Sequence, residues 1–171
     1  MDRLKGKVSI VTGGGKGIGR AISLAFAREG AKVVIAARSE KEGEETVKMI
    51  KERGGEAAFI KTDVSVAADA ERMVRFTVHT FGKLDVLVNN AGVFNLEPPE
   101  ICDLSEEVWD QLMNVNLKGT FLCCKYAIPE MKKAGGGSII NISSIAALNK
   151  SVQPAYAASK GGVNQLTKGI A

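Results

Sequence analysis

Two side chains near the carboxyl end of the sequence could exchange a proton with a bound molecule. In the stretch YAASK, Tyr156 and Lys160 are four residues apart, so on a helix they share one face. A phenol alone is a poor base at neutral pH, but a nearby ammonium group favours the phenolate. Such a pair could donate a proton to a carbonyl oxygen and withdraw it again in the reverse reaction. The spacing equally fits a tyrosine at the edge of the core beside a surface lysine.

Three polar residues, Ser143, Ser144 and Asn116, precede this pair in the sequence. Ser143 and Ser144 follow an apolar stretch, and a hydroxyl there could hydrogen-bond a substrate oxygen as the oxygen gains charge. Asn116 lies within the stretch NVNLKGT. Alternatives remain open, since the serines could end a strand and Asn116 could cap its helix or pair within it.

A glycine-rich turn near the amino end could hold a phosphate group. The stretch TGGGKGIG, Thr12 to Gly19, follows a β-branched run and precedes a helical pattern. It lacks the Lys-Ser/Thr ending of a P-loop, and Ile18 replaces the third glycine of G-x-G-x-x-G. The remaining pattern, T-G-x-x-x-G-x-G, fits either a nucleotide site at a helix amino end or a plain tight turn.

The elements that must position these residues alternate along the chain. Val- and Ile-rich runs predict strands, and apolar residues at three- and four-residue spacing predict helices. Ser39 and Glu42 form the pattern of a capping box. Strands are expected at 7–12, 32–37, 57–61, 84–90 and 138–143. Helices are expected at 18–30, 39–54, 66–81 and 105–134, and from Pro154 onward.

Such alternation with short turns predicts parallel strands joined by right-handed crossovers. The strands are continuous apolar runs, which is typical of a sheet covered on both faces. We therefore predict a doubly wound, Rossmann-like α/β fold with five strands, in one domain spanning residues 1–171. Ligands of such folds bind at the carboxyl ends of the strands, where the longest loop, at 91–104, is expected.

Composition argues against several other kinds of protein. The net charge is +4, from 23 basic and 19 acidic residues, and the cations are scattered, so no nucleic-acid partner is expected. The three cysteines form no C-x-x-C motif and His79 is the sole histidine, so no metal is expected. The amino-terminal apolar run is too short for a signal peptide or a membrane span, so we expect a cytoplasmic protein without a membrane partner.

Five motifs occur together in one order: TGGGKGIG, NNAG at 89–92, NVNLKGT at 114–120, NISS at 141–144 and YAASK. With them the sequence resembles the short-chain dehydrogenase/reductase family over its whole length. Family members continue with a sixth strand, a substrate loop, further helices and a seventh strand. The resemblance therefore implies a carboxy-terminally truncated member that lacks the usual last two strands, with the 138–143 strand at an edge of the sheet.

The resemblance also implies roles for four catalytic residues. Tyr156 would be the proton donor, and Lys160 would favour its phenolate and hold the nicotinamide ribose. Ser144 would hydrogen-bond the substrate oxygen, and Asn116 would hold a water that links Lys160 to solvent. Ser144 precedes Tyr156 by 12 residues, one fewer than is usual in the family, whereas Ser143 has the usual spacing. We expect Ser144 to act, with a loop shorter by one residue.

The implied cofactor is NADP rather than NAD. Ala37 stands where NAD-dependent members tend to have an acid, and Arg38 and Lys16 could bind a 2′-phosphate. Both could also be ordinary surface cations. Asp63 would contact the adenine, although it could equally cap the next helix. The implied nucleotide-binding set is Gly13, Gly15, Lys16, Gly17, Ile18, Gly19, Arg38, Asp63, Val64, Asn90, Ala91, Gly92, Tyr156 and Lys160.

Two functions compete on this basis. The first is an NADP-dependent carbonyl reductase or alcohol dehydrogenase, acting on 3-oxoacyl groups, sugars or other secondary alcohols. The second is an inactive fragment that keeps a dinucleotide site and a surface for oligomerisation. The family's dimers pack the helices that begin near Ser105 and Pro154, so a homodimer or homotetramer is expected if the fold is complete. The substrate is not legible in the loop at 93–104.

Overall fold

The computed structural model describes residues 2–94, 100–149 and 153–171, and along them the predicted alternation is confirmed. The elements follow one another as β1 (Val8–Thr12), α1 (Gly17–Arg28), β2 (Lys32–Ala37), α2 (Glu40–Lys51), β3 (Ala57–Lys61), α3 (Ala67–Phe81), β4 (Val86–Asn89), α4 (Glu106–Leu112), α5 (Gly119–Lys133), β5 (Ser138–Asn141) and α6 (Pro154–Ile170). Residues 95–99 of the long loop expected at 91–104 lie outside the described residues.

The five strands form one parallel sheet in the order β3-β2-β1-β4-β5. The chain first winds from β1 toward β3 and then returns to place β4 on the other side of β1. This reversal is a topological switch point, and in such sheets the crevice beyond the carboxyl ends of the strands is where ligands bind. The doubly wound fold predicted from the sequence is therefore the fold observed.

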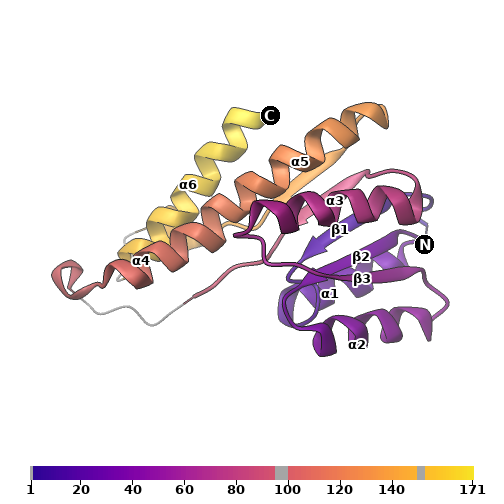
Figure 1. Ribbon diagram of the computed structural model, residues 1–171, viewed down its shortest axis with the longest axis horizontal. Helices are drawn as coiled ribbons and strands as arrows, with labels where there is room; N and C mark the ends of the chain where they lie inside the picture. Colours follow the sequence, from indigo (N-terminus) through magenta and orange to yellow (C-terminus); the bar gives the residue numbers. More distant parts are fainter. Residues whose placement is uncertain (1, 95–99, 150–152) are drawn as a thin grey trace.

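Helices cover both faces of the sheet (Figure 1). Alternate residues of each strand point to opposite faces, so neighbours such as Ile10 and Val11 belong to different apolar clusters. The cluster around Ile10 includes Met73 of α3 and Leu122 of α5. The cluster around Val11 includes Val47 of α2. Every residue of β1 is buried, so the strand that precedes the glycine-rich turn is enclosed on both sides.

The predicted capping box at the start of α2 is confirmed in one of its two halves. The Ser39 hydroxyl accepts a hydrogen bond from the backbone amide of Glu42 at 3.4 Å, as an N-cap residue does. The Glu42 carboxylate, however, lies 3.3 Å from the ammonium of Lys16 in the glycine-rich turn. This side chain therefore connects α2 to the turn.

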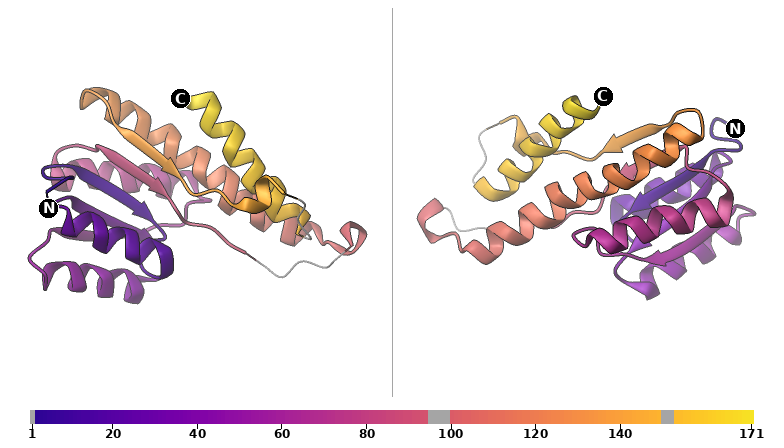
Figure 2. Two further views of the ribbon diagram at one scale, coloured as in Figure 1. Left: turned by 180° about the vertical axis from the view of Figure 1, so that it is seen from behind. Right: turned by 45° about the horizontal axis from the view of Figure 1, so that its top comes forward.

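The single long helix expected at 105–134 is wrong in its middle. Between α4 and α5 the residues Met113–Lys118 form a π-helical segment, although the three pieces together follow nearly one rod (Figure 2). Six residues are too few for apolar spacing to distinguish a π turn from an α turn. The wider turn contains Asn116, and π turns inside α-helices are frequent at functional sites.

Strand β5 lies at an edge of the sheet, as expected, and is the least buried of the strands in the described part of the chain. Its residues alternate between exposed and half-buried, and Ile140 is 41% exposed. The Asn89 side chain ties β5 to its neighbour, because its amide nitrogen donates to Asn141 Oδ1 at 2.8 Å. Asn89 therefore has a strand-tying role.

Candidate active site

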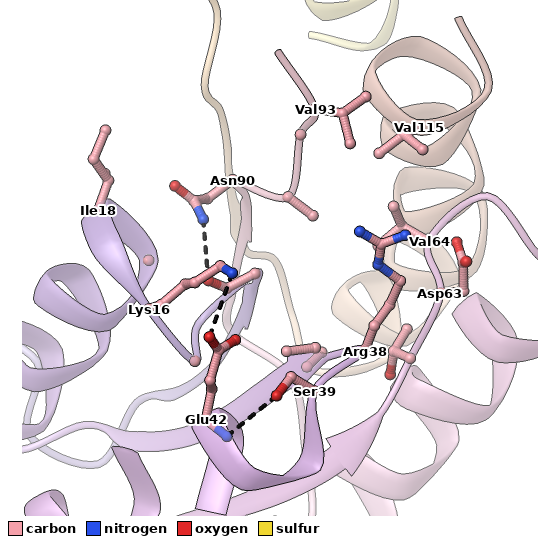
Figure 3. A pocket seen from close by; sticks show the side chains of 18 residues that line it. Lys16, Ile18, Arg38, Ser39, Glu42, Asp63, Val64, Asn90, Val93 and Val115 are labelled. Carbon is pink, nitrogen blue, oxygen red and sulfur yellow. Dashed lines mark hydrogen bonds and ion pairs between the residues drawn. The ribbon is translucent and has the colours of Figure 1, made fainter. Parts of the chain in front are cut away.

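A cleft of about 340 Å³ opens at the carboxyl ends of β1 to β4 (Figure 3). It lies at the switch point of the sheet, where the fold predicts a ligand. Gly17 is not among its lining residues, nor are Tyr156 and Lys160. Eleven of the residues predicted to bind a nucleotide line it: Gly13, Gly15, Lys16, Ile18, Gly19, Arg38, Asp63, Val64, Asn90, Ala91 and Gly92.

The glycine-rich turn has no room for a side chain at Gly13 or Gly19, where bare backbone borders the cleft. Gly13 has a φ of +66°, and a Cβ there would lie 2.9 Å from the Asn90 amide nitrogen. A Cβ at Gly19 would overlap the carbonyl oxygen of Gly13. Helix α1 begins at Gly17 without a side-chain cap from Lys16, and its first turn lines the cleft. An uncapped helix amino end beside bare backbone fits the pyrophosphate of a dinucleotide.

Thr12, which was not predicted as a site residue, fixes the next wall of the cleft. Its hydroxyl accepts hydrogen bonds from the backbone amides of Asn90 and Ala91, both at 3.0 Å, and donates to the carbonyl of Val88 at 3.2 Å. The Asn90 side chain returns a bond to the Thr12 carbonyl at 2.9 Å. The two ligand-facing turns, after β1 and after β4, are therefore locked together. Only the contact across 78 residues reveals this role.

The two cations of the cleft each face an acid. Lys16 pairs with Glu42, and Arg38 lies opposite Asp63 (Figure 3). Partial burial acts to raise the pKa of Asp63, but the hydroxyl and amide of Ser65 and the charge of Arg38 outweigh it, so the pKa is lowered. The sequence pointed to the cations and to Asp63, but Glu42 was not predicted to face the cleft.

Asn116 is buried, and its amide group joins three segments of the chain. Its Oδ1 accepts from the backbone amide of Val93 at 2.8 Å, and its Nδ2 donates to the carbonyl of Val93 at 3.0 Å. The same nitrogen donates to the Ser159 hydroxyl at 3.1 Å, and that hydroxyl donates to the carbonyl of Tyr156 at 2.7 Å. The π segment, the turn after β4 and α6 are thus fixed together, with Ser159 as a member that the sequence did not indicate.

Lys160 is buried, with 5% of its surface exposed. Its ammonium donates to the backbone carbonyl of Ile142 at 2.8 Å and lies 5.9 Å from the centre of the Tyr156 ring. Burial lowers the pKa of Lys160 from its ordinary value. Phe94 packs edge-on against the Tyr156 ring, with ring centres 4.9 Å apart. The predicted acid–base pair therefore lies on one face of α6 in a partly apolar setting.

The two serines after β5 are placed differently. The Ser143 hydroxyl donates to the backbone carbonyl of Lys160 at 3.3 Å, so it fastens this turn to α6. The Ser144 hydroxyl accepts from the amide of Ala146 at 3.2 Å and caps a short 3₁₀ turn. A hydroxyl that accepts a bond still has its own proton to donate. This division of roles favours Ser144 as the donor to a substrate, which stays a prediction.

Gly92 lies between the cleft and the polar side chains of Asn116 and Lys160. It lines the cleft, and a Cβ added to it would lie 3.2 Å from Asn116 Oδ1 and 3.6 Å from Lys160 Nζ. The two groups of predicted residues, from opposite halves of the sequence, thus meet at one glycine. In the described ranges no cluster of three metal-ligating side chains occurs, and no helix there combines the length and the apolar character needed to cross a bilayer.

Comparisons with known proteins agree with the observed fold and assign the chain to a family. The profile of the family described as short chain dehydrogenase matches residues 7–171. An uncharacterized oxidoreductase of Thermotoga maritima is 50% identical over 171 residues, covering 98% of this chain and 65% of that protein. (+)-Borneol dehydrogenase 2 of Salvia officinalis is 42% identical, covering 99% and 60%. A crystal structure described as a short-chain dehydrogenase/reductase from Burkholderia xenovorans superimposes with a TM-score of 0.94 at 37% identity, covering 100% and 70%.

The fold and the cleft define a doubly wound α/β protein with a ligand site at its switch point. The family match then makes the class specific, since the chain belongs to the short-chain dehydrogenase/reductase family of oxidoreductases, which use NAD or NADP. The chain spans less than two thirds of the length of the Thermotoga and Salvia relatives.

Proposed function

We propose that this chain carries the nucleotide-binding and proton-transfer parts of an NADP-dependent oxidoreductase that interconverts a carbonyl and a secondary alcohol. The observation that carries the proposal is the meeting of the cleft with Asn116 and Lys160 at Gly92. A dinucleotide site and an acid–base pair are the two parts that such a reaction needs. The nicotinamide ring supplies the hydride acceptor or donor when the cofactor is bound.

The residues around the cleft have distinct proposed roles toward the cofactor. The turn from Gly13 to Gly19 holds the pyrophosphate through backbone amides and the amino end of α1. Arg38 and Lys16 bind the 2′-phosphate, Arg38 through its planar fork of donors and Lys16 as a point charge. Asp63 and Val64 contact the adenine.

Four side chains divide the work on the substrate. In reduction Tyr156 donates its phenolic proton to the substrate oxygen, and in oxidation it takes the proton back. The Lys160 ammonium stabilises the phenolate, and the Ser144 hydroxyl hydrogen-bonds the substrate oxygen. Asn116 holds a water beside Lys160 through which the proton is replaced. The buried position of Lys160 supports this role, because a charge acts more strongly where water is excluded.

The substrate is proposed only as a class. 3-Oxoacyl groups, sugars and other secondary alcohols share the carbonyl–alcohol pair that the four side chains suit. The 42% identity with a (+)-borneol dehydrogenase adds ring-borne secondary alcohols to the panel worth testing. A homodimer or homotetramer formed through α4, α5 and α6 belongs to the same proposal, supported by the exposed Trp109 and Phe121 on these helices.

Two measurements test the proposal. Titration of the protein with NADPH should show saturable binding, and turnover on a panel of 3-oxoacyl, sugar and cyclic ketones should consume NADPH. Tyr156→Phe should keep the binding and lower turnover by about 10²- to 10⁴-fold, since it removes the proton but not the ring. Binding without turnover on any ketone would favour the alternative of an inactive dinucleotide-binding fragment. Absence of binding would overturn both.

A further inference from the structure

The charges lining the cleft are balanced rather than cationic. Lys16 and Arg38 are the cations, and Glu42 and Asp63 are the acids facing them (Figure 3). Arg38 and Asp63 come from the ends of adjacent strands, β2 and β3. Lys16 and Glu42 come from the glycine-rich turn and the first turn of α2, with Nζ and Oε1 3.3 Å apart. A site for a 2′-phosphate thus contains its own carboxylate.

The fold fixes where this carboxylate stands. Ser39 caps α2 by accepting from the Glu42 amide, and the Glu42 carbonyl accepts from Arg20 at 3.4 Å and from Thr46 at 3.1 Å. Gly15 allows the close approach, since a Cβ there would lie 3.1 Å from the Glu42 carbonyl carbon. The backbone of Glu42 is therefore held against the glycine-rich turn, and its side chain reaches Lys16.

The two side chains of the Lys16–Glu42 pair differ in their exposure to solvent. The Glu42 side chain is 36% exposed, whereas that of Lys16 is 75% exposed. An acid in the first turn of a helix is also stabilised by the helix dipole, which would otherwise favour an incoming anion at the same place. A phosphate at this end of the cleft could be attracted by the Lys16 ammonium and by the amino end of α2. The Glu42 carboxylate already interacts with both of these positive groups.

We infer that Glu42 is a cofactor-specificity residue that weakens the preference for NADP over NAD by holding Lys16 and repelling the 2′-phosphate. The inference rests on the proposed dinucleotide function. NAD has no phosphate at the 2′ position of the adenosine ribose, so its binding depends less on the Glu42 charge than that of NADP does. NADP must compete with the carboxylate for Lys16, and Arg38 remains as its main partner. The affinities of the cleft for NADP and NAD therefore differ less than they would if its two cations acted without Glu42.

The test compares Glu42→Gln with Glu44→Gln. Both remove one negative charge from α2 and keep the side-chain length, but Glu44 is exposed and does not line the cleft. Dissociation constants for NADPH and NADH are measured by fluorescence titration at low and high salt. Glu42→Gln should tighten NADPH binding about tenfold at low salt, less at high salt, and leave NADH within about twofold. Glu44→Gln should change neither.

A second background tests how Glu42 acts. In a Lys16→Met protein, Glu42→Gln should give a smaller gain in NADPH affinity, because the ammonium that it frees is gone. The inference is overturned if Glu42→Gln leaves the NADPH/NADH ratio unchanged, or if Glu44→Gln shifts the ratio as much. If the wild type binds NADH better but Glu42→Gln still moves the ratio toward NADPH, the NADP assignment fails and the inference stands. If the wild type binds neither nucleotide, both fail.

Discussion

The two walls of the candidate site differ in whether backbone or side chains form them. The wall formed by the glycine-rich turn is backbone, set on β1, whose residues are all buried. The wall formed by the π segment and α6 is side chains, held by bonds such as Asn116 to Val93 and Lys160 to the Ile142 carbonyl. It borders β5, the half-exposed edge of the sheet. The first wall should therefore be damaged by adding atoms, and the second by removing polar atoms.

The largest effect is expected from Gly19→Ala in the backbone wall. The new Cβ would overlap the Gly13 carbonyl oxygen and lie 2.6 Å from the side-chain nitrogen of Asn90, and these two groups belong to the two turns that are locked together. We expect a loss of about 3 kcal/mol in the free energy of unfolding, together with loss of NADPH binding. Urea unfolding and nucleotide titration measure the two quantities.

Gly161→Ala is the matched control in the other wall. This glycine lies within α6, and a Cβ there would meet no atom of the described residues within 4 Å. Alanine is the better helix former, so we expect the free energy of unfolding to rise by up to about 1 kcal/mol. Equal damage from both substitutions would show that the walls do not differ in their tolerance of added atoms.

Asn116→Ala should have the next largest effect, now in the side-chain wall. It leaves the backbone amide and carbonyl of Val93 without their side-chain partner, and the Ser159 hydroxyl loses its donor but keeps its bond to the Tyr156 carbonyl. We expect a loss of about 2 kcal/mol in the free energy of unfolding, because partly buried backbone groups become unpaired. Asn116→Asp keeps the acceptor for the Val93 amide, but it turns a carboxylate oxygen toward the Val93 carbonyl and buries a charge, so its loss should be at least as large as that of alanine. A clearly smaller loss for aspartate than for alanine would contradict this account.

The backbone wall was largely predictable from sequence, and the reason is physical. A turn that needs positive φ or bare backbone requires glycine at fixed positions. Gly13 and Gly19 therefore indicate the turn within one short stretch of sequence. The alternating strands and helices that position this turn can also be predicted from local sequence, because each is marked by the spacing of its apolar residues. The doubly wound fold follows from such local patterns without any knowledge of distant contacts.

The side-chain wall was less predictable, because its fixing contacts join distant residues. The bond from Asn116 to Ser159 spans 43 residues, and neither residue type signals the other. The family resemblance supplied Asn116 and Lys160 as site residues but not Ser159, which positions one of them. Glu42 was missed for a related reason, since as a capping residue it had a local explanation that concealed its contact with Lys16.

Asp85 offers a test at the far end of the sheet, away from both walls. Its carboxylate accepts from the Val8 amide at 2.8 Å and pairs with Lys83 at 3.0 Å. Asp85→Ala should cost about 2 kcal/mol in the free energy of unfolding, because the buried Val8 amide loses its partner. NADPH affinity should stay unchanged at neutral pH, and a parallel loss of affinity would show that the cleft depends on this end of the sheet.

The same residue predicts a pH dependence. Partial burial acts to raise the pKa of Asp85, but the hydrogen bonds from Val8 and Lys83 and the charges of Lys83 and Lys7 outweigh it, so the folded pKa is lowered. The stabilisation is therefore complete above the unfolded pKa near about 3.9 and is lost as the pH falls through the folded value. Unfolding measured from pH 7 to pH 3 should show a steeper decline for the wild type than for Asp85→Ala.

The smallest effect on stability is expected from Lys160→Met, although turnover should be lost. Methionine leaves the Ile142 carbonyl without its donor, but it also removes the cost of burying a charge, and we expect the two to offset to within about 1 kcal/mol.

Because burial lowers the folded pKa of Lys160, the unfolded chain binds its proton more tightly than the folded protein does. The wild type should therefore gain stability relative to the methionine variant as the pH rises from the folded pKa toward the unfolded value. Measuring both proteins at pH 7 and pH 10 tests the sign. A loss of several kcal/mol at pH 7 would instead make Lys160 a structural residue, and the side-chain wall would then depend on its charge for folding as well as for proton transfer.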